Sequence, residues 1–335
     1  MNRLQRFLGV GLTLGLAFSS VQASAAEKIR ILFPTWSGYA PVFVANDLGY
    51  FKDLGLEVDV KFEDERANVL AAMARGDIDM QMRTVGEYQG RPRTEKTPGI
   101  IIGTIDESLG GDGVVADGAV KSIADLKGKT VAVEPNIPAR LLLQLELKKV
   151  HMSLDDLKIK QTVTADTVAV FADPSIAAVA TYEPFQSQAL KTLAQRKPHL
   201  LVSSKDYPGY IVDIVIVRAE ELKAHPDKYR KFMIAVFKAI NYFKSNPDDF
   251  MKLAAPHFKL SPADFKSSIE GSLVYTGYDQ TAKFFGTPEK PGTLYKIFDT
   301  VMDLNLENGA SDVKLSSKAS ITSEVMATIK PGDIK

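Results

Sequence analysis

The chain has 335 residues, of which 45% are hydrophobic and 24% charged, and its 41 basic and 41 acidic side chains give a formal net charge of zero. This balance gives no electrostatic reason to expect nucleic acid or an anionic membrane surface as a partner. The sequence contains no cysteine, which excludes disulfides, thiolate metal sites and a cysteine nucleophile.

The first 26 residues contain the three parts of a removable export signal. Two arginines form a basic start, an apolar run follows over 7–18, and the small-residue pattern of a cleavage site lies at 23–25. The apolar run is shorter than the roughly 20 residues that cross a bilayer, and without cysteine the chain has no acceptor for a lipid anchor. We expect cleavage near Ala25 or Ala26 and a soluble periplasmic mature protein. An uncleaved N-terminal anchor is the alternative.

Strand and helix patterns alternate after this signal. Alternate apolar residues over 28–33 are typical of a strand, whereas apolar residues three and four apart over 66–75 are typical of a helix. The predicted strands of this part are 28–33, 56–62, 78–82 and 99–105, and the predicted helices are 41–50 and 66–75. Strands separated by helices indicate a mainly parallel sheet with helices on both faces.

The same alternation starts again near residue 113. The predicted strands here are 113–116, 130–133, 159–163, 176–181, 200–203 and 211–217, with a helix at 138–150 that begins with a proline. The run 211–217 is almost continuously β-branched, which is typical of a buried strand. Beyond residue 220 the pattern is mostly helical, with helices predicted over 226–245 and 292–306.

We interpret this order as an α/β protein of two lobes. The 309 residues left after the signal (335 less 26) are enough for two ordinary domains. The first lobe is expected to contain 27–110 and 219–335, and the second lobe 111–218. The chain would cross between them near 107–113 and 217–221. One continuous doubly wound domain is the alternative.

Several sequence blocks support a more specific interpretation. In chain order they lie at 28–31, 38–41, 48–56, 74–79, 105–116, 122–134, 182–185, 208–213 and 246–248. Together they resemble the solute-binding proteins of ABC importers, in the nitrate, sulfonate and taurine group that also includes binders of thiamine-precursor pyrimidines. The resemblance implies the type II periplasmic binding protein fold, with a ligand cleft between two lobes joined by two crossing strands. It also implies that lobe closure buries the solute and presents one surface to the permease.

The loop after the first strand is a candidate part of the ligand site. In an open α/β sheet, ligands lie beyond the carboxyl ends of the strands. Trp36, the only tryptophan, could stack on a solute or a cation, or could instead fill the core of its lobe. Ser37 and the backbone at Gly38 could donate hydrogen bonds at the start of the next helix. Tyr39 completes this loop.

Two basic residues are candidates for an acidic group of the solute. Arg83, with Thr84 beside it, follows the strand predicted at 78–82 and could form a bidentate pair with a carboxylate or sulfonate, or could be a solvated surface residue. Pro135 and Pro138 remove backbone donors where relatives have a small-residue run that cradles anions. This argues against nitrate and weakens a plain sulfonate site, although Arg140 could compensate.

Acidic residues are more frequent near the predicted strand ends. They are Asp106, Glu107, Asp112, Glu134, Glu183 and Asp213. Several carboxylates that converge on one cleft would favour an amine or a similar cation. By resemblance to taurine-binding relatives, Asp112 is the natural partner of an amino group. Each acid could instead cap a helix or brace a hinge.

The sequence contains no catalytic pattern. The four histidines lie far apart, and neither a G-x-S-x-G elbow nor a phosphate-binding loop is present. We therefore expect no enzyme activity, metal or cofactor, but a monomeric binder of a small nitrogen-containing solute that serves a membrane permease with its cytoplasmic ATPase. A binder of sulfonates or other organic anions is one alternative. A pyrimidine-synthesising enzyme of the same fold is another, although those enzymes use a cysteine-rich segment.

Overall fold

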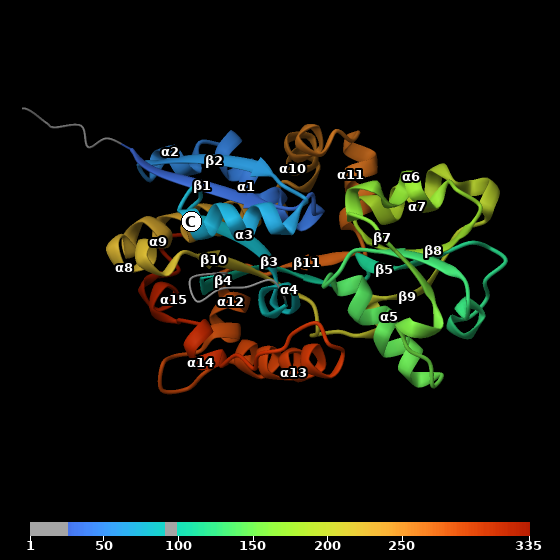
Figure 1. Ribbon diagram of the computed structural model, residues 1–335. Coiled ribbons are helices and arrows are strands. Elements are labelled where there is room, and N and C mark those ends of the chain that lie inside the picture. The colour runs from blue at the N-terminus through green and yellow to red at the C-terminus, as the bar shows by residue number, and fades with distance from the viewer. Residues whose placement is uncertain (1–25, 91–98) are drawn as a thin grey trace, which may run out of the picture.

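We describe residues 26–90 and 99–335 of a computed structural model, so the expected signal at 1–26 lies almost wholly outside the described residues. The chain forms two mixed α/β lobes, one around each of two sheets, which lie side by side in Figure 1. The six-stranded sheet has the order β11-β4-β10-β3-β1-β2, and the five-stranded sheet has the order β7-β6-β8-β5-β9. The α/β fold class with two lobes is therefore confirmed.

The first sheet combines parallel and antiparallel pairs. Its strands are β1 (Glu27–Phe33), β2 (Leu56–Phe62), β3 (Met80–Thr84), β4 (Ile100–Ser108), β10 (Val212–Val217) and β11 (Leu273–Tyr275). β1 pairs in parallel with β2 and β3, whereas β10 runs antiparallel to both β3 and β4. The alternation expected for β1 is present, because Ile29, Ile31 and Phe33 are all buried.

The second sheet has one strand fewer than the first. Its strands are β5 (Asp112–Ala116), β6 (Thr130–Val133), β7 (Lys158–Gln161), β8 (Ile176–Tyr182) and β9 (His199–Ser203). β6 pairs in parallel with β7 and β8, and β5 lies antiparallel between β8 and β9. Every residue of β5 is buried, because its two neighbours leave it no open edge.

β10 corrects one expectation. The sequence pattern places its residues in the second lobe, with a crossing at 217–221, but β10 is hydrogen-bonded between β3 and β4 in the first sheet. The chain therefore returns from the second sheet between Ser203 and Val212. A fully buried strand can lie at the centre of either sheet, so its β-branched sequence identifies the strand but not its partners. The outer limits of the lobes otherwise stay a prediction.

The helices cover both sheets. They are α1 (Ala40–Asp47), α2 (Tyr50–Asp53), α3 (Arg66–Arg75), α4 (Val85–Gln89), α5 (Pro138–Lys149), α6 (Thr167–Phe171), α7 (Phe185–Thr192), α8 (Ala219–Ala224), α9 (Pro226–Ser245), α10 (Pro247–Ala254), α11 (Pro262–Ile269), α12 (Tyr278–Phe285), α13 (Thr293–Glu307), α14 (Ser317–Ser320) and α15 (Glu324–Thr328). The last four lie against the first lobe at the bottom of Figure 1, so the C-terminal part of the chain returns there. Over the described ranges, no helix is long and apolar enough to span a membrane.

One hydroxyl joins the two crossing segments. The Oγ atom of Ser204, which follows β9, lies 2.8 Å from Oγ of Ser108 at the end of β4. It also accepts a hydrogen bond of 2.6 Å from the backbone N–H of Gly110 in the first crossing. The outgoing and returning segments are thus held together at one point between the lobes.

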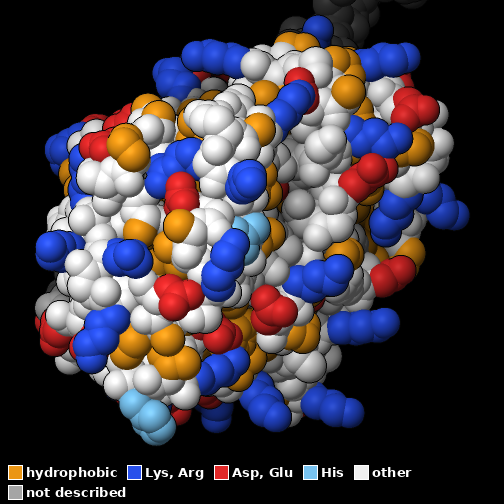
Figure 2. Space-filling model, turned by 90° about the vertical axis from the view of Figure 1, so that its right-hand side faces the viewer, with side chains coloured by type: hydrophobic (Ala, Val, Ile, Leu, Met, Phe, Trp, Pro, Cys, Tyr) orange, Lys and Arg blue, Asp and Glu red, His pale blue; other side chains and the backbone are white. Residues whose placement is uncertain are grey.

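The lobes also meet at both sides of the cleft. On one side, Lys148 of α5 pairs with Glu307 of α13, and on the other, Lys191 of α7 pairs with Asp264 of α11. All four side chains are largely solvent-exposed, and exposed pairs contribute little energy. Figure 2 shows the molecule from the side of the second lobe, with basic and acidic side chains interspersed over this face. This mixture agrees with the balanced net charge.

Candidate functional site

A narrow cavity of about 20 Å³ lies between the lobes. It is lined by Pro34, Trp36, Tyr39, Thr84, Glu87, Asp112, Pro138, Tyr182 and Asp213. The loops after β1 and β3 supply much of the first-lobe wall, and Tyr182 at the end of β8 supplies part of the second. These are carboxyl ends of strands, the position at which α/β sheets bind ligands.

The first-lobe wall is held by hydrogen bonds to buried acids. The indole Nε1 of Trp36 donates to both carboxyl oxygens of Asp106, at 3.1 and 3.2 Å. The hydroxyl of Tyr39 donates to Oδ1 of Asp213. The backbone of Gly38 lies so close to Asp106 that a Cβ at Gly38 would be 2.2 Å from Oδ2 of Asp106, so only glycine fits there. Trp36 is therefore buried, as expected for a residue that fills the core, and it also lines the cavity. Its stacking on a solute stays a prediction.

Asp106 and Asp213 form a pair at the base of this wall. They are opposite residues of β4 and β10, and their carboxyl groups are hydrogen-bonded to each other. Burial raises the pKa of Asp106 to about 7. Burial and the neighbouring charge of Asp106 raise the pKa of Asp213 well above its usual range. Asp213 lines the cavity, whereas Asp106 lies behind it beneath Trp36.

The start of α4 carries a buried ion pair. Thr84 and Glu87 form a capping box, in which the Glu87 N–H donates to Oγ1 of Thr84 and the Thr84 N–H donates to Oε2 of Glu87. The Nη1 atom of Arg83 donates to Oε1 of Glu87 at 2.9 Å. Burial is the largest single effect and lowers the pKa of Arg83, but the charges of Glu87, Tyr182 and Glu134 and the hydrogen bond to Glu87 together outweigh it, so the net direction is upward. Arg83 is neither solvated nor in the cavity wall, because it lies behind Glu87.

The second-lobe wall contains an acid and a phenol. Asp112 begins β5, is 3% exposed, and burial raises its pKa to about 8. The ring of Tyr182 lines the cavity, and among the described residues its buried hydroxyl has no hydrogen-bond partner. An unpartnered buried hydroxyl costs free energy, so Tyr182 has one hydrogen bond to offer a solute.

A second cavity, also of about 20 Å³, adjoins the first. The two share Thr84 and Pro138, and Arg140 lies in the second, beside Asn136 and Gln144. Burial lowers the pKa of Arg140. The inter-lobe space therefore has an acidic, aromatic end and an end with one arginine.

Four of the predicted residues lie outside the cavity and hold the structure. Ser37 is hydrogen-bonded to Ser268 at 2.9 Å, and Glu107 accepts from the backbone N–H of Gly209 at 2.8 Å. Glu134 accepts from the N–H and hydroxyl of Thr164, at 2.9 and 2.7 Å. Glu183 accepts from the hydroxyl of Ser187 at 2.8 Å. These contacts match the bracing role that was the alternative for the acids.

Sequence reasoning omitted Tyr182, Pro34, Glu87 and Pro138 from the candidate site. A signal for Tyr182 was available, because it directly follows the predicted strand 176–181, as Trp36 closely follows 28–33. The sequence pattern identifies Pro138 as a helix start and as a residue that removes a backbone donor from the expected anion cradle. It does not indicate that the residue lines the cavity.

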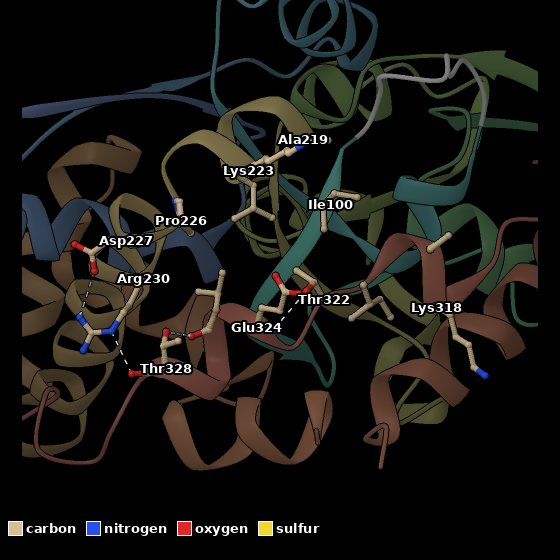
Figure 3. A pocket seen from close by; sticks show the side chains of 14 residues that line it. Ile100, Ala219, Lys223, Pro226, Asp227, Arg230, Lys318, Thr322, Glu324 and Thr328 are labelled. Carbon is tan, nitrogen blue, oxygen red and sulfur yellow. Dashed lines mark hydrogen bonds and ion pairs between the residues drawn. The ribbon is translucent and has the colours of Figure 1, made fainter. Parts of the chain in front are cut away.

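A larger groove of about 720 Å³ lies on the first lobe. It is bounded by the start of β4, by α9 and by the α14–α15 region, as Figure 3 shows. Within it, Arg230 donates to the carbonyl of Thr328 at 3.2 Å and pairs with Asp227 at 3.6 Å. This groove belongs to one lobe, so movement of the other lobe would not enclose it.

The described arrangement of two α/β lobes, with a cavity between them at strand ends, is the periplasmic binding protein fold. The structure matches that of "The alkanesulfonate-binding protein SsuA from Xanthomonas axonopodis pv. citri bound to MOPS", with a TM-score of 0.71 and 16% identity over 90% of this chain and 99% of that one. A family model described as "NMT1/THI5 like" matches residues 36–250. The chain belongs to this family.

Relatives in sequence include binding proteins and an enzyme. A Brucella abortus (strain 2308) protein that carries the name binding protein is 25% identical over 82% of this chain and 85% of its own length. The taurine-binding periplasmic protein of Escherichia coli (strain K12) is 22% identical over 83% of this chain and 88% of its own length. A 4-amino-5-hydroxymethyl-2-methylpyrimidine phosphate synthase of Saccharomyces cerevisiae is 21% identical over 78% of both chains.

Proposed function

We propose that this protein is the periplasmic solute-binding component of an ABC importer, and that it captures a small organic solute with an amine or another nitrogen that donates hydrogen bonds. One observation carries the ligand class. The cavity wall holds three carboxyl side chains, Glu87, Asp112 and Asp213, and its described lining contains no lysine or arginine. Buried carboxyl groups favour a cationic partner.

The aromatic residues fit the same ligand class. Trp36, Tyr39 and Tyr182 line the cavity with the acids. The faces of aromatic rings attract cations, and they do so more strongly where water is excluded. A zwitterion of taurine type could place its amine against these groups and its acidic group near Arg140 in the adjoining cavity.

A ligand panel tests the assignment. The purified mature protein is titrated with ethanolamine, taurine, ethanesulfonate and nitrate, and binding is followed by Trp36 fluorescence and by the shift of the unfolding temperature. Ethanolamine or taurine should bind more tightly than the two anions without an amine. Tight binding of ethanesulfonate or nitrate, with no response to the amines, would transfer the assignment to an organic-anion binder.

The organic-anion alternative has its own observation. Arg140 lines the adjoining cavity, where a guanidinium can pair with an acidic group. Arg140→Met separates the two cases. The variant should weaken binding of ethanesulfonate if an anion is the main ligand, and should leave ethanolamine binding unchanged if the amine is. The enzyme alternative requires conversion of a bound solute, which mass spectrometry of the recovered solute would detect.

Delivery to a permease requires export and closure. Cell fractionation and N-terminal sequencing should find the mature chain in the periplasm, starting near Ala26. Small-angle scattering should give a smaller radius of gyration when the solute is bound, with bending at 109–111 and 204–211, where the two segments cross between the sheets. An unchanged scattering profile at saturation would contradict the closure model.

A further inference from the structure

The contact between Asp106 and Asp213 requires a proton. Both side chains are buried, with 0% and 2% exposure, and their carboxyl groups are hydrogen-bonded to each other. An ionised carboxylate only accepts hydrogen bonds, so one member of such a pair must carry a proton as the donor. The indole of Trp36 donates to both oxygens of Asp106, which identifies Asp106 as the accepting member.

The surroundings favour the protonated pair. The titratable groups that act on it are Tyr39, Glu87, Glu107, Asp112 and Tyr275. None of these described groups is a cation, and Arg83 of β3 is already paired with Glu87. Two adjacent buried carboxylates without a cation repel each other, so a proton stays on the pair.

The pair is open to a ligand on one side. Asp213 lines the cavity, and Asp106 is shielded from it by the indole of Trp36. A cationic group in the cavity would therefore lie against Asp213. It would supply the positive charge that the proton supplies in the empty site.

We propose that the empty cleft holds one proton on the Asp106–Asp213 pair and that the cationic group of the solute displaces it. This inference rests on the proposed function. The ammonium group enters with its own protons, Asp213 releases one proton to solvent, and the total charge of the site stays the same. Binding of an amine should consequently be linked to proton release. Its affinity should rise about tenfold per pH unit below the pKa of the pair, and should level off above it.

The first experiment needs no solute. Trp36 emission is followed against pH in the solute-free mature protein, because its indole is bonded to Asp106. We expect one titration step in wild type and in Asp112→Asn, and a step moved to lower pH in Asp213→Asn, where the amide can donate to Asp106 and no second carboxyl opposes its ionisation. Glu57→Gln, on the exposed edge strand β2, is the matched control and should behave as wild type. A wild type without a step, or an unchanged step in Asp213→Asn, overturns the shared proton.

The second experiment measures the exchange. Ethanolamine and taurine are added to the protein in weakly buffered solution with an indicator dye, and proton release is compared with the amount bound. Close to one proton per bound molecule is expected below the pKa of the pair, and none in Asp213→Asn. Binding without release overturns the exchange but leaves the amine assignment standing. Failure of both probes to bind, with the Trp36 titration intact, overturns the amine assignment and the exchange but leaves the shared proton in place.

Discussion

Trp36 of the first lobe and Tyr182 of the second meet edge to face across the cleft, with ring centroids 6.0 Å apart and an interplanar angle of 84°. Each residue lies at or just beyond the end of a strand, so the two sheets present these rings to each other. An edge-to-face pair of this kind contributes about 0.5–1.5 kcal/mol beyond its burial. Both rings line the cavity, so the two lobes share its wall.

The hydroxyl of Tyr182 should matter for binding but not for folding. Tyr182→Phe keeps the ring contact and removes a buried group without a described partner. We expect an unchanged or slightly higher free energy of unfolding, and weaker binding by about 0.5–1.5 kcal/mol if the hydroxyl bonds the solute. Urea unfolding and titration with ethanolamine and taurine measure the two effects. Wild-type affinity in Tyr182→Phe would exclude a role for the hydroxyl.

Asp112 should be an amine partner. Asp112→Asn keeps the shape of the side chain but cannot become a carboxylate. If the pair with the amine is desolvated, binding of ethanolamine should weaken by about 2–5 kcal/mol, as isothermal titration would show. Glu107→Gln is the matched comparison, because Glu107 only braces Gly209 and should leave affinity near wild type. If Asp112→Asn lowers stability and leaves affinity unchanged, the residue braces the hinge.

Stability of the solute-free protein should fall as pH rises from about 4 to 8. The folded-state pKa is about 8 for Asp112 and about 7 for Glu183, above the ~3.9 and ~4.3 expected for Asp and Glu in an unfolded chain. Between these values the folded state binds more protons than the unfolded state, so the free energy of unfolding decreases with pH by up to about 1.4 kcal/mol per unit for each group. Urea unfolding at a series of pH values measures this slope, which should be shallower in Asp112→Asn. A rising slope across this range would contradict the raised values.

Gly111 should tolerate no side chain. A Cβ there would lie 2.5 Å from Cη2 of Trp36 and 2.9 Å from the carbonyl oxygen of Ser272. Gly111→Ala should therefore displace the indole, change its emission and destabilise the fold by about 1–3 kcal/mol. Gly332→Ala is the control, because nothing among the described residues lies within 4 Å of the point that its Cβ would occupy. Unchanged emission in Gly111→Ala would show that the backbone of the crossing segment moves and that the indole of Trp36 stays in place.

Local pattern was enough to predict most strands and helices, because period-two and helical spacings are encoded within single elements. The limits of β2 and α9 agree with the residues expected at 56–62 and 226–245. It did not place β10, because a strand buried on both faces carries no mark of its neighbours. Which sheet receives such a strand is decided by the whole fold.

Position at or after the end of a predicted strand was enough to place Trp36, Tyr39 and Thr84 at the cavity, whereas Asp112 and Asp213 reach it from the starts of β5 and β10. The sequence could not show whether a carboxylate near a strand end faces the cavity or accepts a hydrogen bond from a nearby residue of the protein. Glu134 and Glu183 each follow a strand, yet they serve Thr164 and Ser187. The sequence contains both partners, but only the folded geometry brings them into contact.

Ser204 has a consequence for how the molecule can move. Its hydroxyl is bonded to Ser108 and to the N–H of Gly110, and Glu107 accepts from the N–H of Gly209, so the outgoing and returning segments are tied to each other. Two untied strands could bend at different heights and let the lobes slide or twist past each other. Segments that are tied to each other should bend together about one axis. The two lobes should therefore meet in the same relative position each time the cleft closes.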